Sequence, residues 1–305
     1  MTKAAAGHAG LLWRSRSMDS ALRDPKVPQE LKDKLGLALE VRAFAFERMG
    51  LKKTRDYSTY TPVQGAVTTV VSACPKTSLK PYRWWFPLVG KVPYKGYFRR
   101  EDALREMKRL QERGFDARVG GVAAYKTPLP FKDPLPSNVL DYPPGELADL
   151  LIHELFHGTV WLKDQVEFDE AAAVFAGQEG AKEFLARRFG EQSSQLREYL
   201  QSLAEQAETG RVMEDLYREL DGLYGGKVSE TEKLDGRIRL FSKYRDRLDL
   251  QEDLNNAAVL AYRLYGRDLS DFRALHERNG RDWKKTVAAL KALDRRDPFA
   301  ALAKG

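Results

Sequence analysis

The feature that most constrains this chain is the segment 147–157, in which two histidines stand four residues apart on an apolar background. Two prolines precede the segment and a glycine follows it, and these residues favour a helix start and a helix end. The apolar residues recur at the spacing of a helix. The segment is therefore predicted to be a mostly buried helix, on which His153 and His157 lie one above the other on the same face.

The pattern His-Glu-x-x-His on such a helix is typical of a metal site. Two imidazoles one turn apart can bind a single zinc ion, and Glu154 stands beside them, where it could act as a base on a metal-bound water. The alternative is a pair of neutral histidines buried for packing alone. The chain contains only 4 histidines and half of them fall in this motif, which favours zinc, with His153 and His157 as ligands.

A catalytic zinc site needs a third protein ligand and an open position for water. The next segment, 167–177, is rich in alanine and predicts a second helix that can approach the first closely. Glu170 lies in this segment, thirteen residues after His157, and it is the predicted third ligand. Glu167 is the competing carboxylate and is less favoured, because it precedes a large apolar residue rather than the alanine run.

Other acids and histidines bear on the same site. His8 and His276 are distant in the sequence and lack neighbours of the kind that bind metals, so neither is expected to be a ligand. His276 is expected on a surface helix, which makes Tyr262 the better candidate for stabilising an oxyanion. Asp169 or Asp164 could accept a hydrogen bond from the imidazole N–H groups, as carboxylates around metal sites commonly do.

Three motifs carry a resemblance to a known family: His-Glu-Leu-Phe-His at 153–157, Phe-Asp-Glu at 168–170 and Gly-Gln-Glu-Gly at 177–180. In these motifs the chain resembles a bacterial family of predicted aminopeptidases, zinc metallopeptidases whose third ligand is glutamate. Shorter matches along most of the chain add to the resemblance, among them Asn-Asn-Ala at 255–257. One departure is Asp169, where the family pattern usually has asparagine.

The resemblance implies a zincin-like fold, Zn2+ as cofactor and a peptide or protein as substrate. The implied reaction is hydrolysis of a peptide bond, with Glu154 as the base. Aminopeptidase action is favoured mainly by the family name, since Asp133, Asp141 and Glu146 could hold a substrate ammonium but form no recognisable anchoring motif. The alternatives are a zinc endopeptidase and a non-catalytic, metal-stabilised scaffold protein of the cell envelope.

Charge and composition bear on other classes of protein. The net charge is +7, but positive and negative residues are interleaved, which is typical of solvated helix faces. No nucleic-acid-binding motif accompanies the charge, so nucleic acid is not an expected partner. The single cysteine, Cys74, excludes an intrachain disulfide. No apolar run has the length of a transmembrane segment.

The first residues, 1–5, do not read as a signal peptide. The resemblance nevertheless implies a lipoprotein-type leader, and therefore a lipid-anchored full-length form in the periplasm or cell envelope. A cytoplasmic location is equally compatible with the single cysteine.

The hydrophobic pattern predicts an α+β fold. Strands are predicted where β-branched and aromatic residues gather, at 66–71, 84–86, 91–98 and 116–125. Helices are predicted at 29–49 and 100–113, and nearly throughout the second half, including 193–207 and 211–223. We expect a small sheet in an N-terminal α/β lobe, 1–145, and a helical zinc-binding lobe, 146–305, that together form one catalytic unit.

Two further segments are candidates for the peptidase site. Adjacent amides at 255–256 begin an apolar helix and need partners if buried, and Tyr262 is one candidate. Tyr262 is also the preferred group for stabilising an oxyanion opposite the metal, ahead of Tyr265 and Tyr125, although a tyrosine packed in the core is the alternative for each. The segment 117–125 either holds the substrate as an added strand or is an ordinary internal strand.

Overall fold

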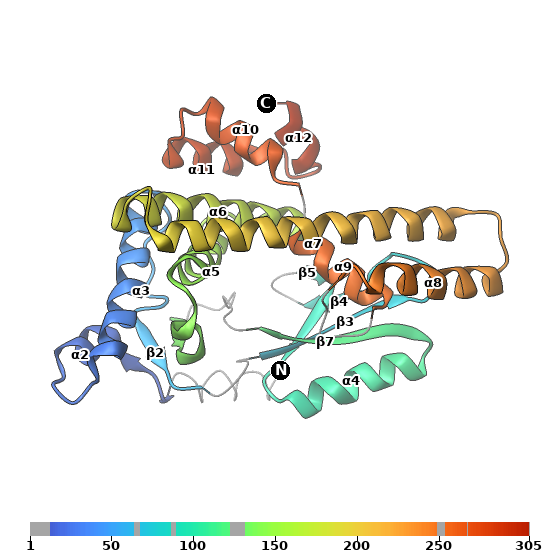
Figure 1. Cartoon of the computed structure of the whole chain (residues 1–305), viewed down its shortest axis with the longest axis horizontal. Helices are drawn as coiled ribbons and strands as arrows, with labels where there is room; N and C mark the ends of the chain where they lie inside the picture. The colour runs from blue at the N-terminus through green and yellow to red at the C-terminus, as the bar shows by residue number, and fades with distance from the viewer. Residues whose placement is uncertain are drawn as a thin grey trace. The chain divides into compact units, whose positions relative to one another are not determined.

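The computed structural model describes residues 13–63, 68–86, 90–122, 132–248, 254–266 and 268–304. Helices and small sheets are mixed and the second half is helical, which confirms the predicted α+β class (Figure 1). The chain forms two compact units, one from Met1–Val67, Val122–Gln201 and Asp268–Gly305, the other from Thr68–Gly121 and Ser202–Arg267. The functional lobes 1–145 and 146–305 stay a prediction.

The first unit combines helices with one small sheet. Its helices are α2 (Met18–Arg23), α3 (Gln29–Glu47), the 3₁₀ helix η1 (Ser137–Asp141), α5 (Pro144–His157), α6 (Val166–Phe189), α10 (Ser270–Arg278), α11 (Trp283–Ala292) and α12 (Pro298–Lys304). Its strands pair in the order β1 (Arg16–Ser17), β2 (Thr59–Thr61) and β8 (Leu135–Pro136), with β1 antiparallel and β8 parallel to β2.

Helix α5 begins and ends where the sequence predicts. Pro143 is its N-cap and Pro144 its first residue, a position where the missing N–H has no intrahelical partner to lose. Gly158 is the C-cap. The apolar residues between these ends are mostly buried and pack against α3 and α6, so the two histidines of α5 are held on a rigid, buried element.

Helices α5 and α6 pack closely because small residues line their contact. A Cβ at Gly177 would lie 2.9 Å from the backbone oxygen of Asp149, and one at Gly180 would lie 3.0 Å from the side chain of Ile152. The alanine run at the start of α6 is fully buried. A carboxylate of α6 can therefore reach side chains that project from α5.

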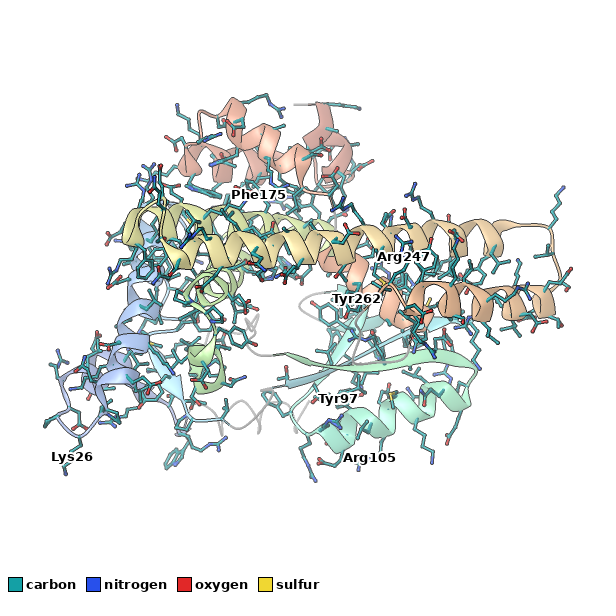
Figure 2. All side chains as sticks on the ribbon, viewed as in Figure 1. Lys26, Tyr97, Arg105, Phe175, Arg247 and Tyr262 are labelled. Carbon is teal, nitrogen blue, oxygen red and sulfur yellow. The ribbon has the colours of Figure 1, made fainter. Side chains whose placement is uncertain are left out.

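The C-terminal helices cover α6 through an aromatic cluster. Phe175 of α6 lies on the side that faces these helices (Figure 2), and its ring contacts those of Phe272 and Trp283. His276 packs on Trp283 with ring centroids 4.3 Å apart, and its Nδ1 lies 2.8 Å from the hydroxyl of Thr286. Most residues of α10 are exposed, as predicted for a surface helix, but His276 lies on its buried side and packs α10 against α11.

The second unit holds the longer strands. They are β3 (Thr68–Pro75), β4 (Trp84–Phe86), β5 (Gly90–Val92), β6 (Tyr94–Tyr97) and β7 (Phe115–Val122), and the helices of the unit are α4 (Arg100–Glu112), α8 (Glu230–Arg245) and α9 (Asn256–Tyr265). β6, β3 and β7 form one sheet in that order, and β4 pairs antiparallel with β5. Among the described strands β7 is therefore an outer strand, and its role in holding substrate stays a prediction.

Helix α7 (Ser194–Gly225) begins in the first unit and continues into the second. It is one helix where the sequence predicts two, so the expected interruption between residues 207 and 211 is wrong. A Cβ at Gly210 would lie 3.6 Å from the backbone oxygen of Gly266, so this glycine faces the end of α9 instead of ending a helix. Neither α7 nor any other described helix is both long and apolar enough to cross a membrane.

Asn256 connects several segments of the second unit. Its side-chain oxygen accepts a hydrogen bond from the hydroxyl of Tyr224 at 2.9 Å, and its Nδ2 donates to the backbone oxygen of Pro75 at 2.9 Å. Its backbone N–H donates to Asp116. The buried amide of Asn256 thus finds a hydroxyl partner in Tyr224.

Replacing Gly177 by alanine should destabilise the first unit, because the added Cβ would press on the backbone of α5. We expect the free energy of unfolding to fall by about 1–3 kcal/mol in urea titrations followed by circular dichroism. Gly36→Ala is the matched control, since no atom lies within 4 Å of a Cβ added there, inside helix α3. This variant should be as stable as the parent or more stable by up to about 1 kcal/mol. Equal losses in both variants would contradict the packing role of Gly177.

Candidate metal centre

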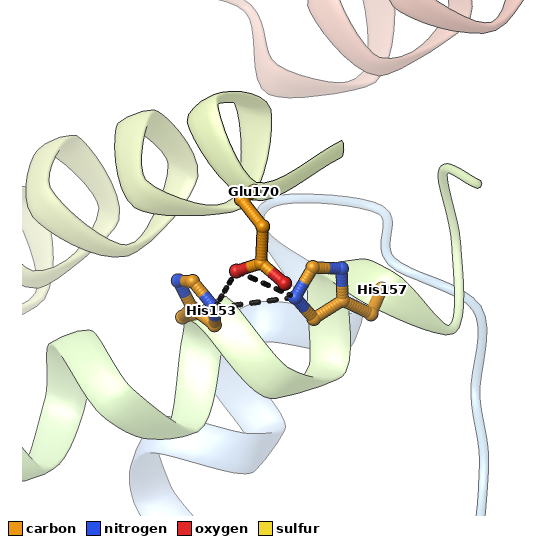
Figure 3. A group of neighbouring side chains, drawn as sticks. All are labelled: His153, His157 and Glu170. Atoms are coloured by element: carbon orange, nitrogen blue, oxygen red, sulfur yellow. Dashed lines mark hydrogen bonds and ion pairs between the residues drawn. The ribbon is translucent and has the colours of Figure 1, made fainter. Parts of the chain in front are cut away.

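Three side chains from α5 and α6 meet at one point (Figure 3). The Nε2 atoms of His153 and His157 lie 3.2 Å apart. Oε2 of Glu170 lies 3.4 Å from Nε2 of His153 and 3.7 Å from Nε2 of His157. Each residue therefore offers one ligand atom to a common centre, from two helices that are fixed against each other.

These distances fit a tetrahedral metal ion. Zinc binds imidazole nitrogen and carboxylate oxygen at about 2.0–2.1 Å, so adjacent ligand atoms of a tetrahedral zinc site lie about 3.3–3.4 Å apart. The observed separations range from 3.2 to 3.7 Å. Imidazole and carboxylate are also donors that zinc takes in catalytic sites, where three protein ligands leave the fourth position to water or substrate. The residues therefore fit such an ion in both geometry and chemistry.

The charges of these three groups are coupled. Burial lowers the pKa of His153, but the contact with Glu170 outweighs burial and raises that pKa to about 9. Burial raises the pKa of Glu170, and its contacts with the two imidazoles reverse the effect and lower the pKa below its usual range. Protons and a metal ion therefore compete for the same nitrogen atoms, and metal binding is expected to weaken as the pH falls.

Glu154 is the acid between the two histidines, and only 9% of its surface is exposed. Burial raises the pKa of its carboxyl, while the imidazoles of His153 and His157 act in the opposite direction. The charges of Glu170 and Asp133 add to the increase. A carboxylate with a raised pKa is a stronger base, which suits a general base.

Two side-chain contacts beside the centre were not predicted from the sequence. Trp161 packs edge-on against the imidazole of His157, with ring centroids 5.9 Å apart, and stays 38% exposed. The hydroxyl of Tyr199 donates a hydrogen bond to Asp149 at 2.7 Å. Burial raises the pKa of Asp149 to about 6, although Tyr199 and His153 both act to lower it. Asp149 stands one helical turn before His153 on α5, and this spacing is the sequence signal that points to it. Trp161 follows the end of α5, so no helical spacing points to it.

The other residues considered for the site differ in their surroundings. Glu167 is exposed, whereas Glu170 is buried beside the imidazoles. Tyr262 belongs to α9 in the second unit (Figure 2) and packs against a hydrophobic cluster of α7 and α8, as the core alternative for this tyrosine requires. Its catalytic role stays a prediction. Tyr125 and the side chain of Tyr265 fall outside the described residues.

The acids considered around the site differ in burial. Asp169 is buried at 1% exposure, while Asp164 is exposed. Of the acids considered for a substrate ammonium, Asp133 is buried, and Asp141 is exposed and forms an ion pair with Lys34.

The family model described as Putative aminopeptidase matches residues 1–301. The chain belongs to this family. The match confirms the family that the sequence motifs indicate, and the family name indicates a peptidase, hence a hydrolase. No curated protein and no solved structure matches the chain.

Replacing either histidine of the cluster should abolish stoichiometric metal binding. His153→Ala and His157→Ala each leave two ligands, which hold a zinc ion poorly. We expect about one zinc per chain in the parent protein, removable by a chelator, and far less than one in each variant, measured by elemental analysis after dialysis. One tightly bound zinc in either variant would show that the residue is not a ligand.

Glu170→Ala should likewise lose or strongly weaken metal binding. Glu167→Ala is its matched control, because this glutamate lies three residues earlier on the same helix and is exposed. The control should bind metal as the parent does. The opposite pattern would make Glu167 the ligand.

Proposed function

We propose that this chain is a zinc-dependent peptidase, with His153, His157 and Glu170 as the zinc ligands. The observation that carries the proposal is the convergence of three ligand atoms at separations that fit a tetrahedral ion. Family membership supplies the reaction class. The proposal implies a zincin-like arrangement, in which the helix with the two histidines contacts a second helix that carries the third ligand.

The residues of the centre have distinct roles in this proposal. Zinc, when bound, supplies Lewis acidity, which lowers the pKa of water and polarises a carbonyl group. His153, His157 and Glu170 hold the ion on one side, so that substrate approaches from the other. Glu154 accepts the proton of the attacking water and delivers it to the leaving amine. The burial of Glu154 raises the pKa of its carboxyl and so makes it a stronger base.

Aminopeptidase action is the more specific part of the proposal. An aminopeptidase binds the free α-ammonium of its substrate, which requires a carboxylate about one residue away from the scissile bond. The family description supports this choice over endopeptidase action. Asp133, Asp141 and Glu146 stay the candidates for the ammonium contact.

Glu154→Gln should keep the metal and lose catalysis, because this side chain is proposed as a base and not as a ligand. We expect the turnover number to fall by about 100- to 10,000-fold, the usual contribution of a general base. Zinc content, measured on the same samples, should equal that of the parent. Loss of the metal from this variant would show that Glu154 is a metal ligand and not the base.

Acetylation of the substrate N-terminus should abolish turnover. Acetylation removes the positive charge that an aminopeptidase must bind, while leaving every other part of the peptide unchanged. Two peptides that differ only in this group are incubated with the zinc-loaded protein, and the products are identified by mass spectrometry. If the blocked peptide is cut internally as fast as the free one, the protein is an endopeptidase.

A further inference from the structure

Trp161 is an exposed aromatic side chain beside the metal centre. It is 38% exposed and packs edge-on against the imidazole of His157, with ring centroids 5.9 Å apart. Other large apolar side chains are also exposed, Trp85 and Tyr142 among them, but within the described part of the chain Trp161 is the one whose ring contacts a proposed metal ligand. Scattered exposed apolar residues are common at protein surfaces, so it is the position of Trp161 that calls for an explanation.

The backbone around Trp161 holds this side chain in place. Its two sequence neighbours, Val160 and Leu162, are buried at 1% and 2% exposure. The backbone N–H of Val160 donates to the backbone oxygen of Phe156 at 2.9 Å, and that of Leu162 donates to Oδ1 of Asp169 at 2.8 Å. The indole therefore stays on the outer side of an anchored segment. A group that is already ordered loses little conformational freedom when it binds a partner, which suits a binding residue.

The indole lies within reach of a substrate side chain next to the scissile bond. In the proposed reaction that bond is held at His153, His157 and Glu170. The two Cα atoms that flank a peptide bond are about 3.8 Å apart, and their side chains extend further from the bond. A large side chain on one of these two residues can therefore touch a ring whose centre is 5.9 Å from that of His157.

The chemistry of this surface favours an apolar side chain. Contact between the indole and an apolar group removes apolar area of both from water, and aromatic pairs gain further from their edge-to-face geometry. The next two residues, Lys163 and Asp164, are both exposed and carry opposite charges. This pair favours neither a cationic nor an anionic side chain, so the indole decides the preference.

We propose that Trp161 is a specificity-determining residue, whose exposed ring binds a large apolar side chain of the substrate residue next to the cleaved bond. The inference rests on the proposed peptidase function and adds its substrate class, peptides with a large apolar residue at that bond. The metal ligands fix where the bond lies, and Trp161 selects which residue stands beside it. An indole that only covers the imidazole of His157 would make no such selection.

The first test measures kcat/KM on matched peptides with the zinc-loaded protein. The peptides carry phenylalanine, alanine or lysine on one side of the cleaved bond, or on the other side in a second set, and are otherwise identical. Trp161→Ala should lower kcat/KM for the phenylalanine peptide of one set by about 10-fold or more, and change that for the alanine peptide by less than about twofold. Trp161→Phe should retain most of the preference, because it keeps an aromatic ring at this position.

Tyr142→Ala is the matched control. Tyr142 is 37% exposed and precedes the N-terminal end of α5, whereas Trp161 follows the C-terminal end. Because a helix rises about 1.5 Å per residue, the 14 residues of α5 place these ends about 20 Å apart. The control should keep the selectivity of the parent. Zinc content should be equal in all these variants, because neither aromatic residue is a proposed ligand.

The second test reads binding without turnover. Zinc-loaded Glu154→Gln is titrated with the same peptides by isothermal titration calorimetry, alone and combined with Trp161→Ala. We expect Glu154→Gln to bind the phenylalanine peptide about 10-fold more tightly than the alanine peptide. Adding Trp161→Ala should remove this difference.

The proposal is overturned if Trp161→Ala changes kcat/KM for the phenylalanine and alanine peptides alike, or changes neither. A preference for the lysine peptide that depends on Trp161 also overturns it, because the ring would then bind a cation. If the zinc-loaded parent cuts no peptide, the proposed peptidase function fails. The calorimetric comparison then decides separately whether Trp161 binds an apolar side chain, and equal affinities for the phenylalanine and alanine peptides would show that it does not.

Discussion

The close approach of α5 and α6 is the constraint on which the rest of the site depends. Gly177 allows it, since a Cβ at that position would meet the backbone of α5 at 2.9 Å. Because the two helices touch, Glu170 comes within 3.4 Å of His153 although the sequence separates them by a turn of the chain. The ligand geometry is thus a consequence of helix packing, and the loop between the helices only has to reverse the chain direction.

The buried carboxylates around the two imidazoles are the second constraint on the site. Glu154, Glu170 and Asp169 are all buried around two imidazoles, and buried carboxylates are costly unless a positive charge compensates them. Protonation of the imidazoles supplies that charge at low pH, which is why contact with Glu170 raises the pKa of His153. A divalent cation supplies it more completely and leaves Glu154 available as a base.

The sequence predicts the parts of this account that depend on local pattern. The bounds of α5, the helix after it and the preference for Glu170 over Glu167 follow from helical spacing and from the alanine run. Features that depend on tertiary contacts could not be predicted in the same way. The sequence predicts a helix break near Gly210, but in the folded chain this glycine faces the backbone of Gly266 inside one continuous helix. Asn256 forms its hydrogen bond with Tyr224, which is thirty-two residues away in the chain.

The burial of Asp169 illustrates the same limit within the site. Helical spacing indicates that Asp169 lies near the ligands, but the sequence alone left Asp164 as an equal candidate. Only the folded chain shows that Asp169 is buried with one oxygen bound to Leu162, while Asp164 is exposed. The burial of His276 depends in the same way on an aromatic cluster built from α6, α10 and α11.

The most direct test of the central claim is X-ray absorption spectroscopy at the zinc edge, on protein loaded with one equivalent of zinc. A zinc ion held by His153, His157 and Glu170 should be four-coordinate, with nitrogen and oxygen ligands at about 2.0–2.1 Å and the scattering pattern of two imidazoles. A six-coordinate shell of oxygen atoms without imidazole scattering would contradict it, because the ion would then be bound outside the cluster of His153, His157 and Glu170.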